Sequence, residues 1–183
     1  MAVTMDHLEN LFKELDLKYR RRDDRSSMET GFQTTHYRDR DGDDGLMVVV
    51  MLREEGEYLS IFAPMAYKID GPHADAFLRA CMIVQWQTKL IQFEYDPDDG
   101  EIRPVIEFPL EDSTLTARQL HRCLRGLTQL VDDHDAMLRH ALETGEIRTN
   151  GSPPRDRAIA ELEELLRRLR EEAGGGQGPP RGV

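Results

Sequence analysis

The sequence predicts an α+β fold, in which helices pack on an antiparallel sheet in the order αβββαββα, followed by an extra C-terminal helix. Three observations favour this fold. Apolar residues recur at helical spacing in four segments, and runs rich in β-branched and aromatic residues lie between them. The connections between neighbouring runs are short and rich in Asp, Gly and Glu, which is typical of hairpins between antiparallel strands.

The four helical segments have recognisable ends. The first covers residues 5–18 after the cap Thr4, and the second covers residues 72–88. In the third, Thr116 and Gln119 have the spacing of a capping box, and Gly145 is placed to cap the C-terminus. The fourth covers residues 153–173.

Five runs predict strands, at residues 31–38, 46–52, 57–68, 90–96 and 101–110. The run 46–52 is apolar on both faces, which predicts a central, covered strand. Pro64 has no N–H to donate, so the strand at 57–68 is expected to lie at an edge or to break there. The charged stretch KYRRRDDRSS (18–27) is expected to be a loop.

Charge and composition limit the partners that the chain can have. Its 183 residues carry a net charge of −11, which argues against nucleic acid and anionic membranes. The two cysteines form no CxxC pair, the N-terminus resembles no signal peptide, and no apolar run is long enough to cross a membrane. We therefore expect a reduced, cytoplasmic protein.

Two acidic clusters suggest metal ligands. In RDRDGDDG (38–45), an EF-hand loop that starts at Asp39 would need Gly at its sixth position and Glu at its twelfth, but Asp44 and Val50 stand there. The stretch is therefore expected to be a solvated hairpin. The second cluster, Asp132, Asp133 and Asp135 beside His134, lacks a second group of ligands and is interpreted as a solvated helix face. No metal site and no cofactor are predicted.

The sequence offers no catalytic constellation. It contains no GxSxG, GxxxxGK[ST], HExxH or GxGxxG motif. His121 and Cys123 are two residues apart on a helix and do not face each other. No catalytic residue is predicted, and the chain is expected not to be an enzyme.

Candidate contact residues are apolar. Trp86 lies between two glutamines and is either a buried anchor or a contact with a partner or a second subunit. Phe77, on the same helix, is a second candidate. The fourth helix has an apolar seam of strict 3, 4, 3 spacing, made of Ile159, Leu162, Leu166 and Leu169. This seam is expected to pack on its own domain or on the same helix of a second subunit, or to recruit a partner.

The run QWQTKLIQFEYDPDDGEIRPVIEFPLEDSTLTARQLHRCLRGLTQLVDDHDAML resembles the YbjN family of bacterial sensory-transduction regulators, whose fold is similar to that of type III secretion chaperones. The features that carry the resemblance are FEYDPDDGEI, the step PLEDSTLT and the helix with RGLTQLVDDHDAML. The resemblance covers about residues 5–145. It implies an acidic homodimer that holds an extended segment of a client protein against apolar patches and sheet edges, and it brings no catalytic residue.

The sequence therefore predicts three segments: a YbjN-like or chaperone-like domain at 1–148, a linker and amphipathic helix at 149–173, and a disordered tail at 174–183. The expected function is non-enzymatic binding of an unidentified client or regulatory protein. One alternative is a structural module that assembles only with itself through the fourth helix. The other is a metal-dependent binder or enzyme that uses the Asp and His clusters.

Overall fold

The structure, a computed structural model, describes residues 2–148. Its helices are α1 (Met5–Glu14), α2 (Ala74–Gln87) and α3 (Ala117–Thr144). Its strands are β1 (Arg20–Arg22), β2 (Ser27–Gln33), β3 (Gly45–Arg53), β4 (Tyr58–Phe62), β5 (Tyr67–Lys68), β6 (Gln92–Tyr95) and β7 (Glu101–Pro109). Short 3-10 turns at Asp23–Arg25 and Glu54–Gly56 join β1 to β2 and β3 to β4.

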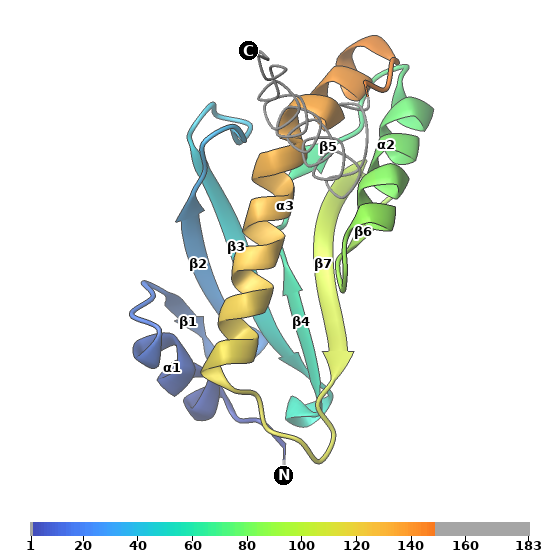
Figure 1. Cartoon of the computed structure of the whole chain (residues 1–183). Helices are drawn as coiled ribbons and strands as arrows, with labels where there is room; N and C mark the ends of the chain where they lie inside the picture. Colours follow the sequence, from blue (N-terminus) through green and yellow to red (C-terminus); the bar gives the residue numbers. More distant parts are fainter. Residues whose placement is uncertain (1, 149–183) are drawn as a thin grey trace, which may run out of the picture. The chain divides into compact units, whose positions relative to one another are not determined.

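All seven strands belong to one antiparallel sheet. Strands β1 to β4 follow one another across the sheet. β7 then pairs with β4 and β5 along one side and with β6 along the other, so that Ile102 lies opposite Tyr67 and also opposite Tyr95. Figure 1 shows α3 running along the sheet, with α1 near β1 and α2 near β6. The predicted α+β fold is confirmed.

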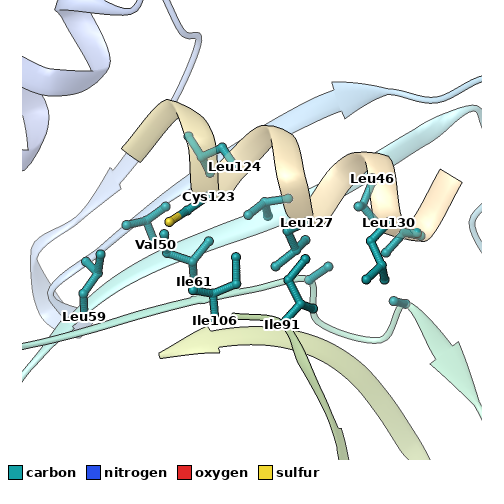
Figure 2. Packing of buried hydrophobic residues seen from close by; sticks show 14 of the residues in the cluster. Leu46, Val50, Leu59, Ile61, Ile91, Ile106, Cys123, Leu124, Leu127 and Leu130 are labelled. Carbon is teal, nitrogen blue, oxygen red and sulfur yellow. The ribbon is translucent and has the colours of Figure 1, made fainter. Parts of the chain in front are cut away.

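The core lies between α3 and one face of the sheet. Figure 2 shows leucines of α3 above residues of β3, β4 and β7. Side chains of β3 alternate, so Val48 and Val50 point into this core while Val49 points to the opposite face. Burial of each large aliphatic side chain contributes about 1.5–3 kcal/mol, and this layer therefore holds the helix to the sheet.

The opposite face of the sheet has a small apolar cluster of its own. Val49, Phe62 and Val105 are buried there, with Met51 packed beside them. The guanidinium of Arg103 lies 4.8 Å from the centre of the Phe62 ring. This face is therefore separate from the main core.

The N-terminal region differs from the prediction. Helix α1 ends at Glu14, because Asp16 has a left-handed φ of 52° that a helix does not continue through. The predicted loop at 18–27 contains β1 and the turn into β2, so that prediction was wrong. A strand made of arginines lacks the alternation of apolar and polar residues by which a strand is recognised. Ion pairs with Glu29 of β2, rather than burial of apolar side chains, stabilise it.

The predicted strand at 57–68 is interrupted. It forms β4 and β5, and between them lie Pro64 and Met65, which has a left-handed φ of 52°. The break expected from Pro64 is confirmed. Both strands pair with β7, so β4 is a central strand.

The caps predicted for α3 are confirmed. The Thr116 hydroxyl accepts the backbone N–H of Gln119, and the Gln119 side chain accepts the backbone N–H of Thr116 at 2.9 Å. At the other end, Gly145 has a φ of 77° and caps the helix. These caps fix both ends of the helix that borders the site described next.

Candidate functional site

The residues predicted to make contacts lie in different environments. Phe77 is fully buried in the core and packs against Tyr67, with ring centres 5.3 Å apart. Its side chain therefore presents no surface in this fold. Trp86 is 90% exposed. The residues of the predicted C-terminal seam lie outside the described residues: Ile159, Leu162, Leu166 and Leu169. The predicted boundary at 148–149 is likewise untested, and both stay predictions.

Trp86 belongs to an exposed apolar stripe along α2. Met82 lies one helical turn before it and is 52% exposed, and Leu90 lies just after the helix and is 68% exposed. Buried residues occupy the other side of α2, among them Phe77 and Val84. The stripe is therefore a surface feature that the core does not use.

A groove of about 500 Å³ lies on the helix side of the sheet, along α3. Its apolar lining comes from three parts of the chain: Leu15 and Leu17 after α1, Phe32 of β2, and Leu124 of α3. Its polar lining consists of Gln33, His121, Arg125, Thr128, Gln129, Asp132 and Asp133. An apolar lining combined with a few polar groups is typical of binding sites.

The groove lies beside an incompletely paired edge of the sheet. The pairing of β1 with β2 stops at Arg20 opposite Glu29, whereas β2 continues to Gln33 beside β3. The bonds from Leu52 to Ser26 and from Thr34 to Asp44 show that even-numbered residues of β2 bond to β3. Gly31 and Gln33 therefore direct their backbone N–H and C=O groups to the outer edge.

Asp132 fixes the end of the groove near Gln33. Its Oδ1 accepts the backbone N–H groups of His36 at 2.6 Å and Tyr37 at 2.9 Å, and both of its oxygens accept that of Thr35. Burial acts to raise the pKa of Asp132, but these three amide donors outweigh it and hold the pKa below its ordinary value. The carboxylate is therefore a structural anchor for the chain after β2.

Asp135 belongs to a buried polar network one turn further along α3. It accepts a hydrogen bond from the Tyr67 hydroxyl at 3.0 Å and forms a salt bridge with Arg139 at 2.9 Å. Burial raises the pKa of Asp135, and the Arg139 charge opposes that rise. The guanidinium of Arg139 lies 5.6 Å from the Tyr37 ring centre and also bonds to the Arg38 carbonyl.

The interpretation of this acidic cluster as a solvated helix face was therefore wrong for two of its three carboxylates. Asp133 is exposed, but Asp132 and Asp135 hold α3 to the rest of the fold. Apart from Arg139, which is four residues from Asp135, their partners lie about a hundred and about seventy residues away in sequence, and a local pattern contains no signal of such distant partners. Among residues 2–148 the structure has no group of three metal-ligating side chains.

The acidic stretch 38–45 forms a turn within the connection from β2 to β3. Asp39 Oδ1 accepts the backbone N–H groups of Asp41 and Asp43, both at 2.9 Å. Gly42 has a φ of 91° and donates its N–H to the Asp39 carbonyl. The turn prediction is confirmed, and the Asp39 side chain organises the turn.

No helix within the described part of the chain is long and apolar enough to cross a membrane.

The arginines of the basic stretch 18–25 pair with carboxylates within the molecule. Arg21 contacts Asp6, Glu9 and Asp23 at 2.6–2.7 Å. Arg20 and Arg22 both pair with Glu29. These cations hold β1 between α1 and β2, so they are structural.

Comparisons with known proteins agree with this architecture. No family model and no curated protein matches the sequence. The chain is similar to the crystal structure of YbjN, a proposed transcription regulator from E. coli, with 9% identity, a TM-score of 0.53 and coverage of 74% of this chain and 94% of that chain.

Two chaperone structures match at lower TM-scores. A chain of the HopA1–SchA chaperone–effector complex matches with 14% identity and a TM-score of 0.46, covering 75% of this chain and 91% of that chain. A chain of the ExsC–ExsE complex matches with 16% identity and a TM-score of 0.45, covering 75% of this chain and 97% of that chain. The resemblance to YbjN predicted from the sequence is confirmed at the level of the fold: the chain has the fold of YbjN.

Proposed function

We propose that the protein is a non-enzymatic, cytoplasmic binding domain that holds a segment of a partner protein in the groove between α3 and β2. The observation that carries the proposal is the position of an apolar groove beside an unpaired stretch of strand edge. The edge groups of Gly31 and Gln33 offer backbone hydrogen bonds to an extended chain. The groove offers a place for its apolar side chains.

The described chemistry favours binding over catalysis. Two carboxylates of α3 with shifted pKa values, Asp132 and Asp135, are occupied by backbone amides, Tyr67 and Arg139. Cys81 and Cys123 are buried, and burial raises the pKa of the Cys81 thiol to about 12, which makes it a poor nucleophile. These groups stabilise the fold, and we assign them no reaction.

The test uses random twelve-residue peptides displayed on phage and selected on the full-length protein. Selected peptides are synthesised, and their binding is mapped by NMR shifts of ¹⁵N-labelled protein. We expect shifts around Gly31, Phe32 and Thr128, and weaker binding to Leu17→Ser, with circular dichroism as the check on folding. Failure to select any peptide that binds there would overturn the proposed function.

We also propose that the α2 stripe joins two copies of the chain. Met82 and Trp86 are exposed one helical turn apart, Leu90 is exposed just after the helix, and exposed apolar surface of this kind is typical of contacts between proteins. Trp86 is the only tryptophan of the chain, so its fluorescence reports directly on this surface. Its emission should move to shorter wavelength as protein concentration rises.

The chain offers a matched control for this contact. Met82 on α2 and Met47 on β3 are both 52% exposed. Met82→Ser and Trp86→Ser should shift sedimentation toward the monomer, while Met47→Ser should not. If Leu162→Ser with Leu166→Ser dissociates the protein and the α2 variants do not, self-assembly through the predicted C-terminal seam is the correct alternative.

A further inference from the structure

We propose that the partner segment held in the groove is acidic, and that its carboxylates bind the arginine-rich first half of α3 while an apolar side chain packs on Leu17 and Phe32. The inference rests on the proposed function and adds the chemistry of the partner. It starts from an uneven distribution of charge. Between Ala117 and Val131, α3 has three arginines and one histidine but no Asp or Glu, in a chain with a net charge of −11.

These cations share one side of the helix. Arg118, Arg122 and Arg125 are spaced by four and three residues, so they follow one exposed stripe, and His121 lies one turn before Arg125. His121 and Arg125 line the groove. One end of the stripe therefore borders the site, and Arg118 and Arg122 continue it along the helix beyond the groove.

Several other arginines of the described chain are paired with carboxylates, whereas those of this stripe are not. Arg21, Arg103 and Arg139 each contact a carboxylate at 2.6–2.9 Å. Within residues 2–148, none of the cations of the stripe forms a salt bridge. Because these unpaired cations are clustered on a half-helix without Asp or Glu, the stripe can attract a carboxylate from outside.

The opposite end of the groove carries negatively charged side chains. Asp132 and Asp133 lie about two helical turns beyond Arg125. Asp132 is committed to the amides of residues 35–37, whereas Asp133 is exposed. A bound segment is therefore oriented, with its acidic residues toward Arg125 and away from Asp133.

Charge and apolar contact have different roles in this site. An exposed ion pair contributes only about 0.2–1 kcal/mol, so the arginines chiefly steer and orient the segment. Leu15, Leu17, Phe32 and Leu124 provide the apolar area from which most of the affinity comes. A segment that has both acidic and apolar residues fits both parts of the groove. A polyanion without apolar groups, such as a nucleic acid, fits only the stripe.

The test uses three peptide libraries with the same apolar positions. Their flanking positions are Asp or Glu in the first, Ser or Gln in the second, and Lys or Arg in the third. On the full-length protein we expect enrichment from the acidic library, and a dissociation constant for the selected peptide that rises steeply with salt.

Charge reversal locates the contact. Arg125→Glu should weaken the selected acidic peptide about tenfold and shift enrichment toward the basic library. Arg53→Glu is the matched control, because Arg53 is also exposed but lies on β3 on the other face of the sheet, and it should leave binding unchanged. Both changes are at exposed positions, so circular dichroism should show folded protein in each case.

The outcomes separate the two proposals. Equal enrichment from the acidic and neutral libraries, with NMR shifts in the groove, overturns the acidic partner and leaves the proposed function standing. No enrichment from any library overturns both. If a single-stranded thymidine oligonucleotide binds as tightly as the acidic peptide and competes with it, the partner is a polyanion and the inference fails.

Discussion

The Tyr67 hydroxyl of β5 donates a hydrogen bond to the Asp135 carboxylate of α3 at 3.0 Å. This bond joins the two-residue strand β5 to the longest helix of the described residues. Because β5 pairs with β7 through two residues only, this bond and the burial of the Tyr67 ring hold it in place. Asp135→Ala should reduce the free energy of unfolding by about 2–3 kcal/mol, since it leaves the Tyr67 hydroxyl and Arg139 without their partner. Tyr67→Phe should cost about 1 kcal/mol. Urea denaturation measures both, and equal losses would contradict this account.

Asp132 gives the stability of the protein a specific dependence on pH. Its pKa in the folded protein is below its ordinary value of 3.8, because three backbone amides bond to the charged form and outweigh the effect of burial. The stabilisation is therefore complete above pH 3.8 and is lost as the pH falls through the folded-state pKa. At neutral pH, Asp132→Ala should lower the free energy of unfolding by about 2 kcal/mol. Urea denaturation over a pH series should show this difference shrinking on acidification. A difference that is constant with pH would contradict the assignment.

Gly100 occupies a position that no other residue fits. Its φ is 79°, and a Cβ there would lie 2.3 Å from the Ile69 carbonyl oxygen. Gly100→Ala should therefore lower the free energy of unfolding by about 2–3 kcal/mol, as measured by thermal or urea denaturation. Gly45→Ala is the control, because nothing lies within 4 Å of its added Cβ and its φ is unremarkable. The control should be neutral or slightly stabilising.

The turn at 38–45 should be indifferent to calcium. Asp39 Oδ1 already accepts two backbone N–H groups from within the turn, so this oxygen faces inward. Millimolar Ca²⁺ should change Tm by less than about 1 °C, whereas Asp39→Ala should cost about 1 kcal/mol of the free energy of unfolding. Asp39→Asn keeps an acceptor oxygen and should cost less. A large rise in Tm with Ca²⁺ that Asp39→Asn abolishes would contradict the turn.

The parts of the fold that the sequence predicts are those determined by neighbouring residues. The ends of α3 follow from Thr116, Gln119 and Gly145, and β3 follows from its apolar run. Strand β1 has no such local signal, because its arginines are stabilised by Glu29 of the next strand and by residues of α1. The role of Asp132 likewise depends on amides far away in sequence.

The groove is a product of the tertiary fold. Leu17, Phe32 and Leu124 look like ordinary core residues in the sequence, and only the fold brings them together around a common space. One part of the site did have a sequence signal: the absence of acidic residues from the first half of α3 is visible in the chain itself. Its meaning depends on knowing that the arginines lack partners, which requires the structure.

The late position of β7 and α3 in the chain affects how the protein is made. On the ribosome, β2, β3 and β4 can form consecutive hairpins as they emerge, but β5 and the outer edge of β4 have no partner strand until residues 101–109 have been synthesised. The inward valines and isoleucines of these strands stay uncovered until α3 follows. If translation pauses between β5 and α3, the sheet keeps an unpaired edge and an exposed apolar face. The nascent chain is therefore most prone to aggregate during that interval.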